Sequence, residues 1–89
     1  MLTIKFTTNF KKSYTKIIRR KPEAGFDILE KLLLFTINPF NPRLDTHKLK
    51  GKYSELWSFT VQYDLRIIFG FESENSVILV DIGTHDEVY

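Results

Sequence analysis

The residues best suited to acid–base chemistry lie at the C-terminal end of this 89-residue chain and in its middle. His85 and Tyr89 follow an apolar run and a glycine, and His47 lies in a polar stretch. Histidine can donate or accept a proton near neutral pH, because its unperturbed pKa is about 6.5. Asp64 and Arg66 add a carboxylate and a guanidinium. These five side chains are the candidate catalytic residues.

These residue types match the requirements of RNA cleavage without a metal. Such cleavage needs a base for the ribose 2′-hydroxyl proton, an acid for the leaving 5′-oxygen, and a cation for the charged phosphate. The planar guanidinium of Arg66 can contact two phosphate oxygens, and Tyr89 can stack on a base. The sequence has no Ser/His/Asp signature, P-loop, GxGxxG or HExxH motif.

Each of these residues also has an ordinary structural explanation. A single histidine is usually a plain surface residue, and Arg66 can simply pair with Asp64 or Glu55. Alternating lysines can serve only to protect a strand edge from aggregation. The residue types therefore leave a structural role open.

The first part of the sequence predicts a strand followed by two helices. Residues 2–7 alternate apolar and polar side chains, with Phe6 among those that face inward. Thr8 or Asn9 can cap a helix, which ends before Lys21-Pro22 because the residue before a proline avoids the helical region. A second helix begins at Pro22 and forms an αα-hairpin with the first. Its predicted apolar stripe comprises Ile28, Leu29, Leu32, Leu33 and Phe35 or Thr36.

The second part predicts an antiparallel meander. After a loop over residues 38–52, strands are expected at residues 55–62, 64–71 and 76–82, with short connections that require antiparallel neighbours. The fold class is therefore α+β, with a single domain over residues 1–89 and both helices on one face of the sheet. The opposite face, which carries Arg66, is expected to be partly open.

Composition and charge indicate the cellular location and the kind of ligand to expect. The chain has no cysteine, no signal-peptide pattern and no apolar run that could span a bilayer, so we expect a cytoplasmic protein without a membrane or a metal. Residues 1–52 carry a charge of +8 and residues 53–89 a charge of −6, which predicts a basic surface for a polyanion unless the halves neutralise each other. The candidate RNA-binding residues are Lys48, Lys50, Lys52, Arg43, Arg19 and Arg20.

Four segments resemble the RelE/ParE toxin superfamily, and the YafQ-like branch in particular. They are Lys48–Gly51, Leu56-Trp57, Asp64–Phe69 and Ile82–Tyr89, the last of which contains a Gly-Thr-His motif. The resemblance implies a RelE-like fold and the toxin of a type II toxin–antitoxin system. It also implies a ribosome-dependent endoribonuclease that cuts mRNA without a metal or other cofactor. The implied partner is a cognate antitoxin, acidic or amphipathic, laid across the helices or the active face.

The resemblance also implies roles for single residues. His85 matches the catalytic C-terminal histidine, Arg66 the arginine on the scissile phosphate, and Tyr89 the tyrosine that stacks on the codon. His47 and Asp64 match a loop histidine and an aspartate of the family, and Lys48, Lys50 and Lys52 a basic comb. One position departs from the pattern, because Thr60 replaces a second histidine. The base is therefore open between Asp64 and His47, while His85 is expected to be the acid.

Two other functions remain compatible with the sequence. A ParE-like protein would inhibit DNA gyrase by binding, without nuclease chemistry, and the same fold serves both activities. A structural module that binds RNA or protein would also account for the charge distribution.

Overall fold

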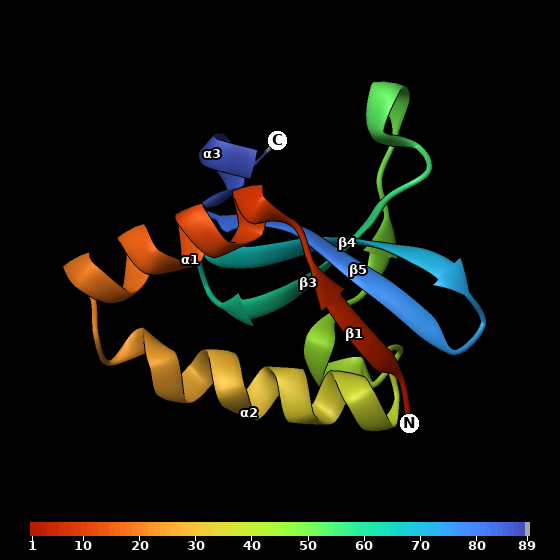
Figure 1. The fold of residues 1–89 in the computed structure, drawn as a ribbon, viewed down its shortest axis with the longest axis horizontal. Helices are drawn as coiled ribbons and strands as arrows, with labels where there is room; N and C mark the ends of the chain where they lie inside the picture. Colours follow the sequence, from red (N-terminus) through yellow and green to blue (C-terminus); the bar gives the residue numbers. More distant parts are fainter. Residues whose placement is uncertain (89) are drawn as a thin grey trace.

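The computed structural model describes residues 1–88, apart from the side chains of Asp86 and Glu87. Two helices lie against a twisted sheet, and a short third helix follows the last strand (Figure 1). The elements are β1 (Thr3–Phe6), α1 (Thr8–Arg20), α2 (Ala24–Ile37), the 3₁₀ turn η1 (Pro42–Leu44), β2 (His47–Lys48), the 3₁₀ turn η2 (Gly51–Tyr53), β3 (Trp57–Gln62), β4 (Leu65–Ser73), β5 (Ser76–Gly83) and α3 (His85–Val88).

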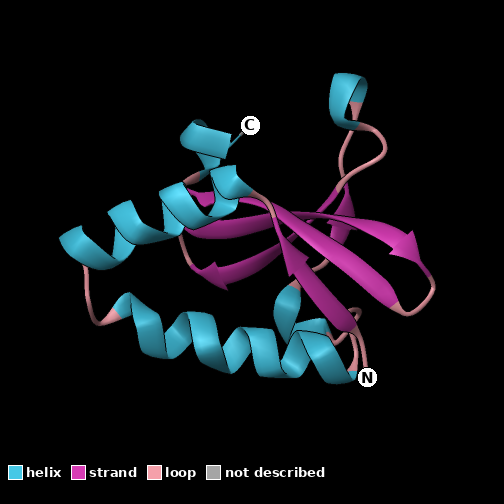
Figure 2. Ribbon diagram, in the orientation of Figure 1, coloured by secondary structure: helices cyan, strands magenta, loops and turns pink. Residues whose placement is uncertain are grey.

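The sheet is mixed, with five strands in the order β1-β5-β4-β3-β2. Strands β3, β4 and β5 form the predicted antiparallel meander, and β1 pairs with β5 in parallel. The α+β prediction is confirmed (Figure 2). Strand β2 lies within the segment predicted to be a loop, because a two-residue strand is too short to show an alternating pattern.

Three phenylalanines form the centre of the core. The ring of Phe35 on α2 stacks on Phe59 with the ring centroids 4.5 Å apart, and it meets Phe69 edge-on at 4.7 Å. None of the three side chains is exposed to solvent. Because Phe59 lies on β3 and Phe69 on β4, this cluster fixes α2 against the middle of the sheet, and Phe10 and Ile17 of α1 extend the same core.

The start of α1 is fastened to β5 through one hydroxyl. Thr7 Oγ1 accepts a hydrogen bond from the Phe10 backbone N–H at 2.9 Å and donates one to the Val80 carbonyl at 2.8 Å. The cap is therefore Thr7, and the prediction of Thr8 or Asn9 was wrong by one or two residues. Phe6 was also predicted to face inward, but 48% of it is exposed because it lies at the open rim between the two helices.

Helix α2 is apolar on two opposite faces, which overturns part of the predicted stripe. Its core face carries Ala24, Ile28 and Phe35. Leu29 and Leu33, predicted to be buried, are 58% and 56% exposed. With Phe26 and Ile37 they form a second apolar stripe on the outside, at spacings of three, four and four residues. The helix begins at Ala24, two residues after the predicted start, since Pro22 and Glu23 form a turn.

None of the helices among residues 1–88 is long and apolar enough to cross a membrane.

Phe35→Ala is expected to lower the free energy of unfolding by about 3–5 kcal/mol, because it leaves a cavity at the centre of the core. Leu33→Ala on the same helix is the matched control, and it should cost less than about 1 kcal/mol since Leu33 is largely exposed. Urea denaturation followed by circular dichroism measures both. Equal costs would contradict the assignment of the two faces of α2.

Candidate functional site

Arg66 lies at the centre of the candidate site. Its neighbours along β4, Leu65 and Ile67, are buried in the core, so alternation places Arg66 on the opposite face of the sheet. In the ladder Arg66 lies opposite Thr60 on β3 and opposite Gly83 on β5. Its Nη1 donates a hydrogen bond to Thr60 Oγ1 at 3.3 Å. The guanidinium is half-buried, and it has other N–H groups that can bind a ligand.

The face around Arg66 is only partly open. Ser58 and Ile68, which also belong to this face, are buried. Leu56 lies across Gly70, where an added Cβ would come within 3.2 Å of the leucine Cδ2. Helix α3 contacts both β4 and β5. Thr60 and Arg66, by contrast, are partly exposed.

His85 begins α3, two residues after Gly83, which is the residue paired with Arg66. The chain turns directly into this short helix, and the Val88 N–H donates to the Thr84 carbonyl at 3.1 Å. The histidine is exposed. The β4–β5 register therefore brings His85 and Arg66 to the same end of the sheet. Tyr89, the fifth predicted catalytic residue, lies outside the described residues.

Asp64 lies in the exposed turn between β3 and β4, directly before β4 begins. It borders a cleft of about 490 Å³ between this turn, the end of α1 and the residue before His85. The cleft is lined by Ile17, Arg20, Lys21, Gln62, Tyr63, Asp64, Leu65 and Thr84. The structure thus places Asp64 and the predicted RNA-binding residue Arg20 around one hollow, together with Lys21, which the sequence analysis had not included.

His47 lies on the edge strand β2, opposite Ser58 of β3. Its Nδ1 is 3.1 Å from the Asp45 carbonyl oxygen, and its Nε2 is 3.4 Å from Ser58 Oγ. The histidine is exposed, whereas Ser58 is completely buried. The contact between His47 and Ser58 could not be predicted from the sequence. An alternating strand pattern does not show which residue, here 11 positions away, lies opposite on the neighbouring strand.

The three predicted RNA-binding lysines are all exposed and close in sequence, but they do not lie along one strand edge. Lys48 belongs to β2, Lys50 precedes η2, and Lys52 lies within it, 5.1 Å from the centre of the Tyr53 ring. Gly51 permits the turn between them, because it adopts a φ of +70°. In Figure 1 the green loop with η2 and the blue helix α3 both extend above the sheet, whereas α2 lies below it.

The predicted RNA-binding arginines are distributed over the molecule. Arg43 lies in η1, with its Nη2 4.0 Å from Glu30 Oε2 of α2, on the side away from η2 and α3 (Figure 1). Arg19 is exposed in the last turn of α1, next to Arg20 in the cleft. The structure therefore groups Arg20 with the candidate catalytic residues and separates Arg43 from them.

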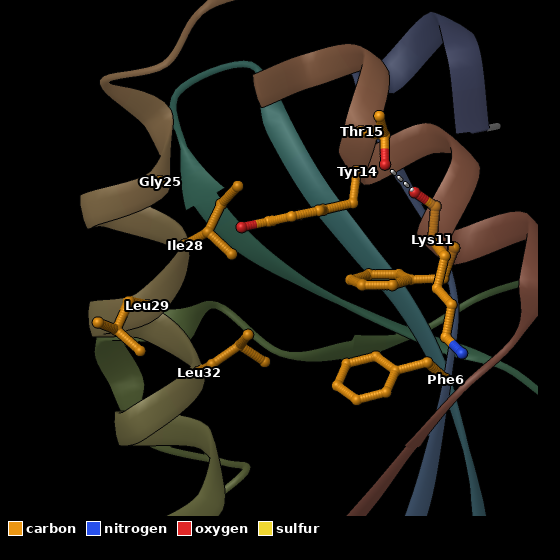
Figure 3. Close-up of a pocket in the computed structure, with 9 residues that line it drawn as sticks. Phe6, Lys11, Tyr14, Thr15, Gly25, Ile28, Leu29 and Leu32 are labelled. Atoms are coloured by element: carbon orange, nitrogen blue, oxygen red, sulfur yellow. Dashed lines mark hydrogen bonds between the residues drawn. The ribbon is translucent and has the colours of Figure 1, made fainter. Parts of the chain in front are cut away.

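A second hollow lies between the two long helices. It is a groove of about 410 Å³ with largely apolar walls. Figure 3 shows Lys11 and Thr15 on its α1 side. The groove is lined by Phe6, Phe10, Lys11, Tyr14, Thr15, Gly25, Ile28, Leu29 and Leu32. It contains none of the candidate catalytic residues, so it is a separate feature of the surface.

Among the described residues, no three His, Cys, Asp or Glu side chains come together as metal ligands.

The class of protein to which the chain belongs, the toxins of type II toxin–antitoxin systems, is shown by a family model. A family model described as the bacterial toxin of a type II toxin–antitoxin system, YafQ, matches residues 2–89. The chain belongs to this YafQ toxin family.

Solved structures share the fold along all or nearly all of the chain. A metal-bound toxin from Helicobacter pylori has a TM-score of 0.74 and 25% identity, with 100% of both chains covered. YafQ in the Escherichia coli DinJ–YafQ complex has a TM-score of 0.76 and 19% identity, covering 100% of this chain and 99% of that one. The YoeB/ParE toxin from Agrobacterium tumefaciens has a TM-score of 0.79 and 16% identity, covering 94% and 99%. No curated protein sequence matches the chain.

Proposed function

We propose that this toxin is a ribosome-dependent endoribonuclease that cleaves mRNA without a metal and so inhibits translation. The observation that carries the proposal is the position of Arg66, opposite Gly83, with His85 two residues further along the chain. This arrangement supplies a phosphate-binding cation and a proton donor at one end of the sheet. Because its proposed substrate is mRNA on the ribosome, the toxin is proposed to act in the cytoplasm.

The chemistry follows from these groups. Arg66 contacts the non-bridging oxygens of the scissile phosphate and stabilises the charge that develops there. The ribose 2′-oxygen attacks the phosphorus, its proton passes to a base, and the bond to the 5′-oxygen breaks. His85 protonates that leaving oxygen. Asp64, at the cleft beside Thr84, and His47, on β2, are the two candidates for the base.

Other predicted residues, apart from Arg43, are proposed to bind the RNA. Lys48, Lys50 and Lys52 are exposed on the segment that runs from β2 into η2, where they can neutralise phosphates. Tyr89 is proposed to stack on a base of the codon. Arg19 and Arg20 extend the basic surface from the end of α1.

A cognate antitoxin is the proposed protein partner, since Escherichia coli YafQ forms a complex with DinJ. The groove between α1 and α2 is a suitable binding surface, because it presents Leu29, Leu32 and Phe6 in an apolar channel. Lys11 lies at the rim of the groove, and Lys12 is exposed beside it on α1. These features favour an amphipathic antitoxin helix whose apolar side chains enter the groove and whose flanks are acidic.

The alternative function is inhibition of DNA gyrase by binding. It is favoured by the likeness to the YoeB/ParE toxin, which shows that the fold is shared with proteins of that name. His85 and Arg66 at one end of the sheet favour the nuclease instead.

Purified toxin is expected to cut mRNA on programmed ribosomes, and His85→Ala should lower the cleavage rate by about 10²–10⁴-fold because the leaving oxygen loses its acid. Primer extension measures the cut. Lys5→Ala is the control, since Lys5 lies on the far edge strand and pairs with Glu72. Intact mRNA together with blocked gyrase supercoiling would support the alternative function.

Replacing Lys48, Lys50 or Lys52 with alanine is expected to reduce the log–log salt slope of RNA binding by about 0.7 for each phosphate that the variant no longer neutralises. The slope is measured by titrating labelled single-stranded RNA at several salt concentrations. Lys5→Ala should leave the slope unchanged. If the lysine variants behave like this control, the loop does not contact RNA.

Leu29→Asp is expected to weaken antitoxin binding by about 10–100-fold, because it removes apolar area and adds a carboxylate to the groove. Leu33→Asp is the matched control, since Leu33 is similarly exposed on the same helix but does not line the groove. Calorimetric titration with the cognate antitoxin measures both. Equal affinities for the two variants would place the antitoxin elsewhere.

A further inference from the structure

We infer that the cleft beside Tyr63 is a nucleotide subsite, in which the Tyr63 ring stacks on a base of single-stranded RNA and Lys21 contacts the adjoining phosphate. The inference rests on the proposed function and extends it to residues that the catalytic assignments do not use. Three observations carry it: the exposure of Tyr63, the cations that line the same cleft, and the contacts that connect this end of the sheet to both helices.

Tyr63 is almost entirely exposed. The exposed fraction of its side chain is 96%, the largest of any aromatic residue among residues 1–88. With Asp64 it forms the two-residue connection between β3 and β4, since Gln62 and Leu65 are paired in the ladder. Connections of this length favour Asn, Asp and Gly, and a tyrosine gains little from burial there. An aromatic ring presented in this way can stack on a base, because every base has a π face.

The Tyr63 ring borders the cleft of about 490 Å³ at the end of α1. Arg20 and Lys21 line the same cleft, as does Thr84, the residue before His85. Sites for single-stranded nucleic acid combine cations that neutralise the backbone with aromatic rings that stack on bases. This cleft has both kinds of group.

Hydrogen bonds connect the end of β3 to both helices. Gln62 Nε2 donates to Asp27 Oδ2 in the first turn of α2, and Lys21 Nζ donates to Gln62 Oε1 at 3.4 Å. Lys21 is the residue that ends α1, and Gln62 directly precedes Tyr63. These contacts place the Lys21 ammonium next to the residue before the aromatic ring. The ammonium is exposed and has three N–H donors, so it can bind a phosphate as well.

The cleft adjoins the proposed catalytic residues. Asp64, a candidate base, directly follows Tyr63, and Thr84 precedes the proposed acid His85. A base stacked on Tyr63 is therefore assigned to a nucleotide that flanks the scissile phosphate. The cations alone would also attract an acidic protein segment, but the exposed ring favours RNA because stacking on bases adds affinity that charge does not supply.

Stacking can be tested without cleavage, using a short single-stranded RNA with 2′-O-methyl groups. We expect the Tyr63 ring protons to shift upfield in NMR spectra of the toxin titrated with this RNA, because a stacked base shields them. Tyr63→Ala should weaken RNA binding by about 10–100-fold, whereas Tyr63→Phe and Tyr63→Trp, which keep a stacking surface, should stay within about threefold of the parent. Phe26→Ala is the matched control, since this ring is 81% exposed but does not line the cleft.

Two further measurements separate the roles of the ring and the cation. Lys21→Ala should reduce the log–log salt slope of RNA binding by about 0.7, the value for one phosphate. On programmed ribosomes Tyr63→Ala is expected to raise KM by roughly tenfold, with kcat within about threefold of the parent, and Tyr63→Phe should restore the parent KM. Thermal unfolding checks that each variant is folded.

Unshifted Tyr63 ring protons in the presence of RNA would overturn the inference, as would equal RNA affinities of Tyr63→Ala and Phe26→Ala. Weaker antitoxin binding by Tyr63→Ala with unchanged RNA binding would also overturn it and assign the cleft to the protein partner. If the parent toxin cuts no mRNA on ribosomes, the proposed function fails. The ring-proton shifts and the RNA affinities would still decide whether the cleft binds a nucleotide.

Discussion

The pairing of β4 with its two neighbours determines which side chains meet at the site. Arg66 lies opposite Thr60 on one side and Gly83 on the other, so a slip of one residue would turn the arginine into the core. The buried residues on either side of it, Leu65 and Ile67, make such a slip costly because they would become exposed. The packing of Phe35 against the central strands thus maintains the register on which the position of the guanidinium depends.

Because the strand register places Arg66 on the face opposite the helices, the molecule has two surfaces with different chemistry. The face that carries Arg66 also carries Thr60, and His85 follows two residues after Gly83, the partner of Arg66 in the ladder. The helical hairpin carries an apolar groove and an outer apolar stripe on α2. The proposed RNA-binding surface and the groove proposed for the antitoxin are therefore different parts of the molecule.

The sequence predicts the elements well because their patterns are local. Alternation identifies β3, β4 and β5, and the same alternation places Arg66 opposite the core. It could not show which apolar face of α2 is buried, since Leu29 and Leu33 are as hydrophobic as the true core residues. The pairing of His47 with Ser58 and the parallel pairing of β1 with β5 depend on tertiary contacts between distant segments. The catalytic and RNA-binding assignments remain predictions, and the structure adds that Arg20 lies with the candidate site and Arg43 away from it.

The central claim is that the toxin cleaves RNA through the ribose 2′-hydroxyl, with Arg66 on the phosphate and His85 on the leaving oxygen. An mRNA with a single 2′-deoxynucleotide at the mapped cut site tests this claim most directly, because it removes the nucleophile and leaves every phosphate in place. The account predicts that programmed ribosomes carrying this mRNA are not cut there, while an all-ribose mRNA is cleaved. Cleavage of both mRNAs at the same position would contradict it.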